Sequence, residues 1–196
     1  MFLYRIGKVI LFILFKILFR LTVKGKEHFP KEGGVLLCSN HISNFDPPIL
    51  GVAAPRMIRF MGKEELFRNP FLRKLFVTLG GFPIKRQAGD KEALKKGLQI
   101  LKNEEVLGIF PEGTRSKTGE LKQGLAGAGF FALRSNALVV PCAIIGNYKP
   151  FRKITVVFGK PIDLEEQRKN KISAKEATEI IMKEIKNILE KEKTNI

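Results

Sequence analysis

The chain has 196 residues, of which 44% are hydrophobic, and this is enough to build one domain around a single core. Lys and Arg number 35 against 19 Asp and Glu, a formal net charge of +16, so we expect an anionic partner. The candidates are a phosphorylated substrate, a membrane face or a nucleic acid. Two cysteines are too few for a disulfide scaffold, and both stand in apolar runs typical of buried, inert thiols.

The first predicted element is a helix over residues 2–23, which is strongly apolar but contains four cations. Its longest charge-free run, Val9–Phe15, is far shorter than the roughly 20 residues that cross a bilayer. At about 100° per residue, the cations fall within one sector of the helix and apolar side chains fill the rest. These cations are Arg5, Lys8, Lys16 and Arg20. The pattern predicts a membrane-interfacial helix, residues 1–23, ahead of a domain that spans residues 24–196.

Three other structures are compatible with an apolar N-terminal segment. A tilted membrane-spanning helix and a core helix packed on its own domain stay open. A cleaved signal peptide is disfavoured, because Lys16 and Arg20 interrupt the apolar region and no small-residue cleavage site follows.

Short apolar runs bounded by Gly and Pro then alternate with helical patterns. The predicted strands are Val35–Ser39, Met57–Met61, Phe82–Lys85, Val106–Phe110, Leu138–Ile145 and Ile154–Phe158. The predicted helices are Pro47–Ala53, Asn69–Leu79, Lys91–Asn103, Gly124–Ser135 and a charged C-terminal helix at about 174–192. Ser173 and Glu176 form a capping box at the start of this last helix. Alternation of this kind predicts a single α/β domain with a largely parallel, mixed sheet flanked by helices.

The segment most suggestive of chemistry is Asn40–Pro48, which follows the first predicted strand. His41 stands five residues before Asp46, and histidine can exchange a proton near neutral pH. A carboxylate beside it can fix the tautomer of the ring and stabilise the imidazolium that forms. This pattern predicts a general base for a hydroxyl group. The structural alternative is a plain loop in which Asp46 caps a helix that begins at Pro47.

Three more segments follow predicted strands and carry cations. FPEGTRS, residues 110–116, offers an acid, a glycine turn, hydroxyls and Arg115, a set that can bind a phosphate. GGFPIKR, residues 80–86, ends in two cations, and Lys63 follows a third strand. Each alone is also typical of a solvated strand end. Because the carboxyl ends of parallel strands meet at one edge of a sheet, together they predict one crevice with a base and an anion site.

These segments resemble the sequence blocks of the glycerolipid acyltransferases, and most closely those of the 1-acyl-glycerol-3-phosphate acyltransferase family. NHISNFD resembles the family's NHxSxxD box, while GGFPIKR, FPEGTRS and VVPCAI resemble its second, third and fourth blocks in the same order. The resemblance extends from about residue 24 to 165. It implies an α/β enzyme at the cytoplasmic face of the cell membrane, peripheral or monotopic, with lysophosphatidic acid as acceptor and phosphatidic acid as product.

The resemblance also implies roles for single residues. His41 is the general base and Asp46 orients it, while the substrate phosphate binds Lys63, Arg86, Thr114 and Arg115. Glu112 and Gly113 shape the acceptor site, and Pro141 lies near the acyl donor. Backbone N–H groups of residues 41–46 are candidate oxyanion donors. The acyl chain passes directly from acyl-CoA or acyl-carrier protein, with no acyl-enzyme, cofactor or metal.

Two other functions are alternatives to this one. Within the enzyme class, the acceptor could be glycerol-3-phosphate or another lysophospholipid. Outside it, the net charge would suit a non-enzymatic module that binds anionic lipid or nucleic acid. Nucleic acid is disfavoured as a partner, because the cations are scattered, Trp is absent and no known nucleic-acid-binding signature occurs.

Overall fold

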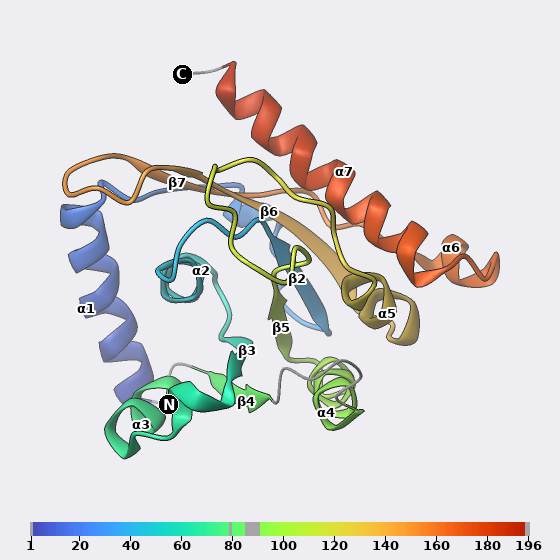
Figure 1. The fold of residues 1–196 in the computed structure, drawn as a ribbon, viewed down its shortest axis with the longest axis horizontal. Coiled ribbons are helices and arrows are strands. Elements are labelled where there is room, and N and C mark those ends of the chain that lie inside the picture. The colour runs from blue at the N-terminus through green and yellow to red at the C-terminus, as the bar shows by residue number, and fades with distance from the viewer. Residues whose placement is uncertain (1, 79, 85–90, 195–196) are drawn as a thin grey trace.

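The computed structural model describes residues 2–78, 80–84 and 91–194. Its centre is one seven-stranded sheet in the order β1-β7-β6-β2-β5-β3-β4 (Figure 1). The pair β6–β7 is antiparallel and the other neighbouring pairs are parallel. The strands are β1 (Thr22–Lys24), β2 (Val35–Ser39), β3 (Ile58–Lys63), β4 (Gly81–Ile84), β5 (Val106–Ile109), β6 (Leu138–Gly146) and β7 (Ile154–Phe158).

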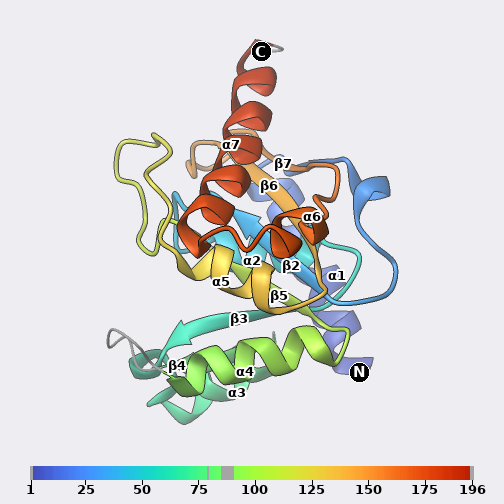
Figure 2. The ribbon, with the colours of Figure 1, turned by 90° about the vertical axis from the view of Figure 1, so that its right-hand side faces the viewer.

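Helices cover both faces of the sheet. The described helices are α1 (Phe2–Leu18), α2 (Asp46–Ala53), α3 (Pro70–Thr78), α4 (Lys91–Lys102), α5 (Gly127–Arg134), α6 (Glu165–Lys169) and α7 (Ala174–Lys193), with 3₁₀ turns η1 (Lys26–His28) and η2 (Glu64–Phe67). Figure 2 shows α4, α5 and α7 in front of the strands. This layered architecture confirms the predicted α/β fold.

The central strand β2 explains why the sheet needs two layers of helices. All five of its residues are buried. Val35 and Leu37 belong to the core that α1 and α2 cover, while Leu36 and Cys38 belong to the core under α4, α5 and α7. Alternate side chains of a strand point to opposite faces of the sheet, so a strand that is apolar throughout needs both faces of the sheet covered from water.

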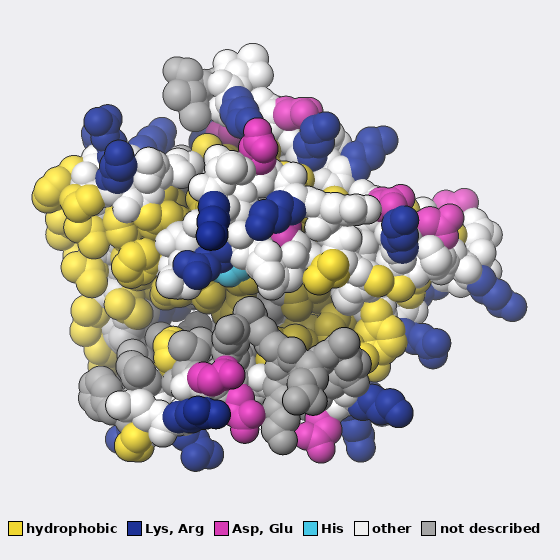
Figure 3. Space-filling model, in the orientation of Figure 1, with side chains coloured by type: hydrophobic (Ala, Val, Ile, Leu, Met, Phe, Trp, Pro, Cys, Tyr) yellow, Lys and Arg dark blue, Asp and Glu magenta, His cyan; other side chains and the backbone are white. Residues whose placement is uncertain are grey.

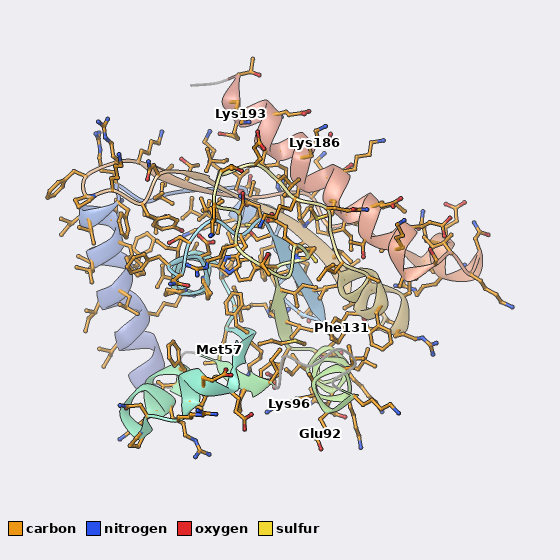
Figure 4. All side chains as sticks on the ribbon, viewed as in Figure 1. Met57, Glu92, Lys96, Phe131, Lys186 and Lys193 are labelled. Atoms are coloured by element: carbon orange, nitrogen blue, oxygen red, sulfur yellow. The ribbon has the colours of Figure 1, made fainter. Side chains whose placement is uncertain are left out.

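The second core depends on close helix packing. Phe131 lies between α5 and α4 in Figure 4, and a Cβ at Gly97 of α4 would come within 2.5 Å of its ring. Gly97 therefore makes room for Phe131. The C-terminal helix α7 begins with the expected capping box, in which Ser173 Oγ accepts the Glu176 N–H and Glu176 Oε2 accepts the Ser173 N–H.

The predicted strands and helices are present and, apart from the N-terminal helix, their described ends differ from the expected ones by at most three residues. Leu79, Lys85 and Arg86, which the predictions included, lie outside the described residues. Two short elements, β1 and α6, were not expected.

The N-terminal helix is shorter than the expected 2–23, because α1 ends at Leu18. The last carbonyls of the helix are taken by another part of the chain: Phe151 N–H donates to Leu18 O, and Ile154 N–H donates to Phe19 O. Arg20 adopts a positive φ of 43°, which a continuing helix does not allow. The chain then joins the sheet as β1.

Only part of α1 faces solvent. Phe15 and Phe19 are buried in the core beside α2, and Lys8 donates to the carbonyl of Ala54 at the end of α2. One of the four cations therefore faces the protein, and its burial lowers the pKa of Lys8. An apolar side stays exposed (Figure 3, left). Its residues are Ile6, Val9, Ile10, Ile13, Leu14 and Ile17. Within the described residues, no helix is both long and apolar enough to span a bilayer.

Candidate active site

The sequence blocks meet at the carboxyl edge of the sheet. β6, β2, β5 and β3 are consecutive neighbours, and all four run in the same direction. The β2–α2 loop (residues 40–45), the β5–α5 loop (110–126) and the β6–β7 loop (147–153) therefore emerge side by side. Neighbouring strands are about 4.8 Å apart, so these loops can share one site.

His41 and Asp46 form a close pair at this edge. His41 Nδ1 lies 2.7 Å from Asp46 Oδ2, and the same oxygen accepts the N–H groups of Ile42 and Ser43, also at 2.7 Å. The Asp46 side chain is 0% exposed and that of His41 13%. The carboxylate thus turns back to the loop before it and does not cap α2, which was the structural alternative.

This contact fixes the reactive nitrogen of His41. With Nδ1–H donating to Asp46, the lone pair is on Nε2, the nitrogen a general base uses. The imidazole stacks on the Phe110 ring, with 4.0 Å between centroids and 14° between planes, and Phe110 stacks in turn on Phe60. Phe110 therefore covers one face of the imidazole ring.

The backbone of His41 is held from both sides by the third block. Its N–H donates to Glu112 Oε1 at 2.7 Å, and its carbonyl accepts the N–H of Ser116 at 2.7 Å. Glu112 Oε2 accepts the N–H of Lys122 at 3.0 Å. The buried Glu112 carboxylate therefore connects the β2–α2 loop to the β5–α5 loop. Both of its oxygens are engaged by backbone groups of the protein.

Asn40 fixes the other end of the β2–α2 loop. Its buried side-chain amide accepts the Ile144 N–H at 2.7 Å and donates to the Ile144 carbonyl at 2.9 Å. Two bonds to one residue of β6 leave the amide a single orientation. Asn40 therefore sets where the chain leaves β2 and turns toward His41.

Backbone N–H groups of this loop were expected to include the oxyanion donors. Instead, the N–H of His41 donates to Glu112, those of Ile42 and Ser43 to Asp46, that of Phe45 to Ser43 Oγ and that of Asp46 to the Ser43 carbonyl. These five groups already have partners. That this loop supplies the oxyanion donors therefore stays a prediction.

The β5–α5 loop presents cations and hydroxyls to solvent. Gly113 has a φ of +69°, and a Cβ there would meet Leu125 Cδ1 at 2.5 Å, so the turn favours glycine. Thr114 and Arg115 are exposed. Lys122, which the sequence did not single out, places Nζ 2.8 Å from the Arg115 carbonyl and 3.4 Å from Thr114 Oγ1. In Figure 3 Lys and Arg side chains lie beside a small exposed area of histidine.

The remaining expected site residues are Lys63, Arg86 and Pro141. Lys63 ends β3, two strands from β2, with its backbone at the same edge. Arg86 lies outside the described residues. Pro141 is buried in the middle of β6, paired with Cys38, and its ring lies near Gly159. The structure does not bring Pro141 together with His41.

Three further groups have raised pKa values: the phenol of Tyr148 and the thiols of Cys38 and Cys142. Burial, and then the charge of Asp46, raises the pKa of Tyr148, whose hydroxyl donates to Asp46 Oδ1 at 2.7 Å. Burial also raises the pKa of the free thiols of Cys38 and Cys142, both 0% exposed. The sequence did not identify Tyr148 as a site residue. Its only distinguishing feature in the sequence is that it follows a predicted strand.

The surroundings of the site add two observations. A cavity of about 750 Å³ lies between η2, α3 and α4 beside the edge strand β4, and no residue of the β2–α2 loop lines it. Among the described residues, no group of three His, Cys, Asp or Glu side chains could hold a metal ion.

Comparison with known proteins places this geometry in a family. The model of the Acyltransferase family matches residues 20–145. The 1-acyl-sn-glycerol-3-phosphate acyltransferase of Bacillus subtilis is 32% identical over 147 residues, which cover 71% of this chain and 72% of that protein. The protein of the same name from Borreliella burgdorferi is 27% identical over 149 residues, 74% of this chain and 58% of that protein.

A solved structure shares the fold. The crystal structure of the 1-acyl-sn-glycerophosphate (LPA) acyltransferase PlsC from Thermotoga maritima superposes with a TM-score of 0.68 and 24% identity, over 86% of this chain and 71% of that one. The family model covers well over half of the chain and includes His41, Asp46 and the FPEGTRS block. The chain therefore belongs to the acyltransferase family, among the 1-acyl-sn-glycerol-3-phosphate acyltransferases.

Proposed function

We propose that the protein transfers a fatty acyl group from an acyl thioester to the sn-2 hydroxyl of lysophosphatidic acid, giving phosphatidic acid for phospholipid synthesis. The observation that carries this proposal is the 2.7 Å contact between His41 Nδ1 and buried Asp46, beside a loop with exposed cations. The names of the Bacillus and Borreliella relatives support the same acceptor.

In the proposed reaction, His41 Nε2 removes the proton of the acceptor hydroxyl while the hydroxyl oxygen attacks the thioester carbonyl carbon. Asp46 stays ionised and offsets the charge of the imidazolium. When the tetrahedral intermediate collapses, the C–S bond breaks and the sulfur leaves with the proton that His41 returns. An ester and a free thiol result, with no acyl-enzyme. The burial of both thiols supports direct transfer.

The β5–α5 loop is the proposed binding site for the acceptor phosphate. Arg115 can bind phosphate oxygens in a bidentate manner, and Lys122 and Thr114 add two more donors. We place Lys63 and Arg86 around the same phosphate as further cations. Glu112 acts in this scheme by holding His41 and Lys122 in place, since both of its carboxylate oxygens accept backbone N–H groups.

The decisive test is transfer of a radiolabelled acyl chain to lysophosphatidic acid by wild-type protein and by His41→Ala. General-base catalysis contributes about 10²–10⁴-fold, so kcat of the variant should fall by that factor with the fold intact. His28→Ala is a matched control, because the other histidine lies on η1 and contacts the Phe158 carbonyl at 3.0 Å, away from the site. Near wild-type turnover by His41→Ala would remove His41 from the mechanism.

The same assay identifies both substrates. Acyl-CoA and acyl-carrier protein are offered separately as donors, and lysophosphatidic acid competes with glycerol-3-phosphate and lysophosphatidylcholine as acceptor. A phosphate site predicts efficient transfer to the phosphate monoesters and poor transfer to the choline lipid. A preference for lysophosphatidylcholine would contradict the proposed function of the β5–α5 loop.

We propose that the exposed apolar side of α1 rests in the membrane interface, at the cytoplasmic face where both thioester donors are made. Phe15 and Phe19 are part of the core, so substitution is a cleaner test than deletion of the helix. Changing Ile10, Ile13 and Ile17 to Ser removes three exposed apolar side chains and should release the protein from phosphatidylglycerol vesicles. Unchanged sedimentation of this variant with the vesicles would contradict the membrane proposal.

A further inference from the structure

Tyr148, on the β6–β7 loop, contacts the oxygen of Asp46 that does not face the histidine. Its hydroxyl donates to Asp46 Oδ1 at 2.7 Å, while Oδ2 accepts from His41, Ile42 and Ser43. The tyrosine comes from a segment 102 residues away in the chain. Because β6 and β2 are parallel neighbours, their carboxyl ends bring the two loops together.

The ring of Tyr148 is confined by two phenylalanines. It lies edge-on to Phe19, with 5.3 Å between centroids and 85° between planes, and it stacks on Phe45 at 5.8 Å and 28°. Phe45 directly precedes Asp46, and Phe19 follows the end of α1. A ring held in this way has little freedom, so its hydroxyl is delivered to one position beside the carboxylate.

The direction of this hydrogen bond determines its effect on Asp46 and His41. Because burial and the neighbouring anion keep the phenol protonated, Tyr148 acts as a hydrogen-bond donor across the working pH range. The positive end of its O–H dipole points at Asp46. It therefore stabilises the carboxylate anion and weakens the pull of that anion on a proton at His41.

We propose that Tyr148 is a positioning residue for the acyl transfer: it fixes the plane of the Asp46 carboxylate and lowers the proton affinity of His41. The inference rests on the proposed function of His41 as base, since it concerns the group that orients that base. Tyr148 itself contacts neither reacting atom in this scheme. Its effect passes through Asp46.

Tyr148→Phe tests this directly, because it keeps the ring between Phe19 and Phe45 and removes only the hydroxyl. The protein has two histidines, so the imidazole NMR resonances of the full chain can be titrated individually, with His28 as internal reference. The His41 resonances should titrate at a higher pH in Tyr148→Phe than in wild type, because Asp46 loses a donor, while the His28 resonances should be the same in both proteins. Other titratable groups facing the pair, Glu112 and the Cys142 thiol, are the same in both proteins.

Kinetics give a second readout. In Tyr148→Phe, kcat should fall roughly tenfold, because a buried carboxylate oxygen loses its donor. The acid limb of the kcat/KM profile should move to higher pH. Ser135→Ala is the control: it removes a hydroxyl that donates to the Phe131 carbonyl at 2.7 Å at the far end of α5, and it should leave the limb in place.

Identical His41 titration and identical kcat in Tyr148→Phe and wild type would overturn the inference. This outcome differs from failure of the proposed function, in which His41→Ala would retain transfer. Tyr148→Leu guards against a packing effect: if only the ring mattered, Tyr148→Phe would behave as wild type and Tyr148→Leu alone would lose activity. That result would also overturn the function assigned to the hydroxyl.

Discussion

The β2–α2 loop and the β5–α5 loop flank the same histidine, but their polar groups are used differently. In the first loop, the N–H groups of His41, Ile42 and Ser43 all donate to buried carboxylates. In the second loop, Thr114 and Arg115 are exposed. The described hydrogen bonds of Lys122 Nζ go to these two residues of the same loop. One loop is a closed network and the other opens to solvent.

This difference separates two tasks. A base must be held in one orientation before the substrate arrives, because small displacements of a reacting group are costly in rate. A phosphate that enters from a membrane or from solution is better met by long cationic side chains that can adjust. Substitutions in the closed network should therefore lower kcat, whereas substitutions of the exposed cations should raise KM.

The largest effect is expected for Asp46→Asn. An amide nitrogen at this position would donate to His41 Nδ1, move the ring proton to Nε2 and so remove the lone pair that acts as base. We expect kcat to fall by about 10²–10⁴-fold in the acyl-transfer assay. Asp163→Asn, an exposed acid that accepts the Glu165 N–H, is the matched control. A loss smaller than about threefold would show that the base does not need the carboxylate.

Glu112→Gln should have the next largest effect, and it acts on the connection between the two loops. The glutamine has one acceptor oxygen where two backbone N–H groups, of His41 and Lys122, need one each. An unsatisfied buried donor costs about 1–3 kcal/mol, so the free energy of unfolding should fall by that amount in urea. We also expect kcat to drop roughly tenfold, as the backbone of His41 loses its anchor.

Glu120→Gln provides the comparison for that experiment, because Glu120 is an exposed acid on the same loop. If Glu112→Gln leaves stability unchanged but raises the KM for the acceptor, Glu112 contacts the substrate and the sequence-based assignment is the better one. A loss of stability would identify Glu112 as a structural residue, and a higher acceptor KM would identify it as a substrate-binding residue.

Arg115→Ala should change KM more than kcat. A charge-assisted contact to phosphate contributes about 1.5–3 kcal/mol, and exposure reduces this, so we expect the acceptor KM to rise about tenfold. Lys122→Ala should act in the same direction with a smaller change, since an ammonium makes no bidentate contact. Lys186→Ala on α7 (Figure 4) is the control cation. An unchanged acceptor KM in Arg115→Ala would place the phosphate elsewhere.

Local patterns were enough to predict most of the fold. The buried runs and bounding Gly and Pro identified β2 and β7 with their observed ends, and Ser173 with Glu176 identified the start of α7. The elements that were missed are those without a local signal. β1 is three residues long and forms by pairing with β7, and α6 is a five-residue helix of charged and polar side chains.

The site was predictable only where the chemistry is local. His41 and Asp46 are five residues apart, and their spacing was informative. The contacts of Glu112 and Tyr148 span 71 and 102 residues, so they depend on strand order, which the sequence did not specify. The end of α1 was misjudged for the same reason, because the N–H groups that bond to Leu18 and Phe19 belong to the β6–β7 loop and to the first residue of β7.

The smallest effect is expected for the two thiols, and it tests direct transfer. Cys38 and Cys142 are fully buried, and burial raises both pKa values, so neither thiol forms the thiolate that a nucleophile requires. Cys38→Ala and Cys142→Ala should keep kcat within about twofold, at a cost of about 1 kcal/mol in the free energy of unfolding for the lost packing.

Mass spectrometry of protein quenched during turnover tests directly whether an acyl-cysteine forms. We expect no acyl group on either cysteine, because His41 activates the acceptor hydroxyl and the thioester is attacked without a protein nucleophile. An acyl-cysteine that appears and decays at the rate of turnover would overturn the direct mechanism. It would also require the sheet core to open in every cycle, since Cys38 and Cys142 lie in β2 and β6, the two central strands of that core.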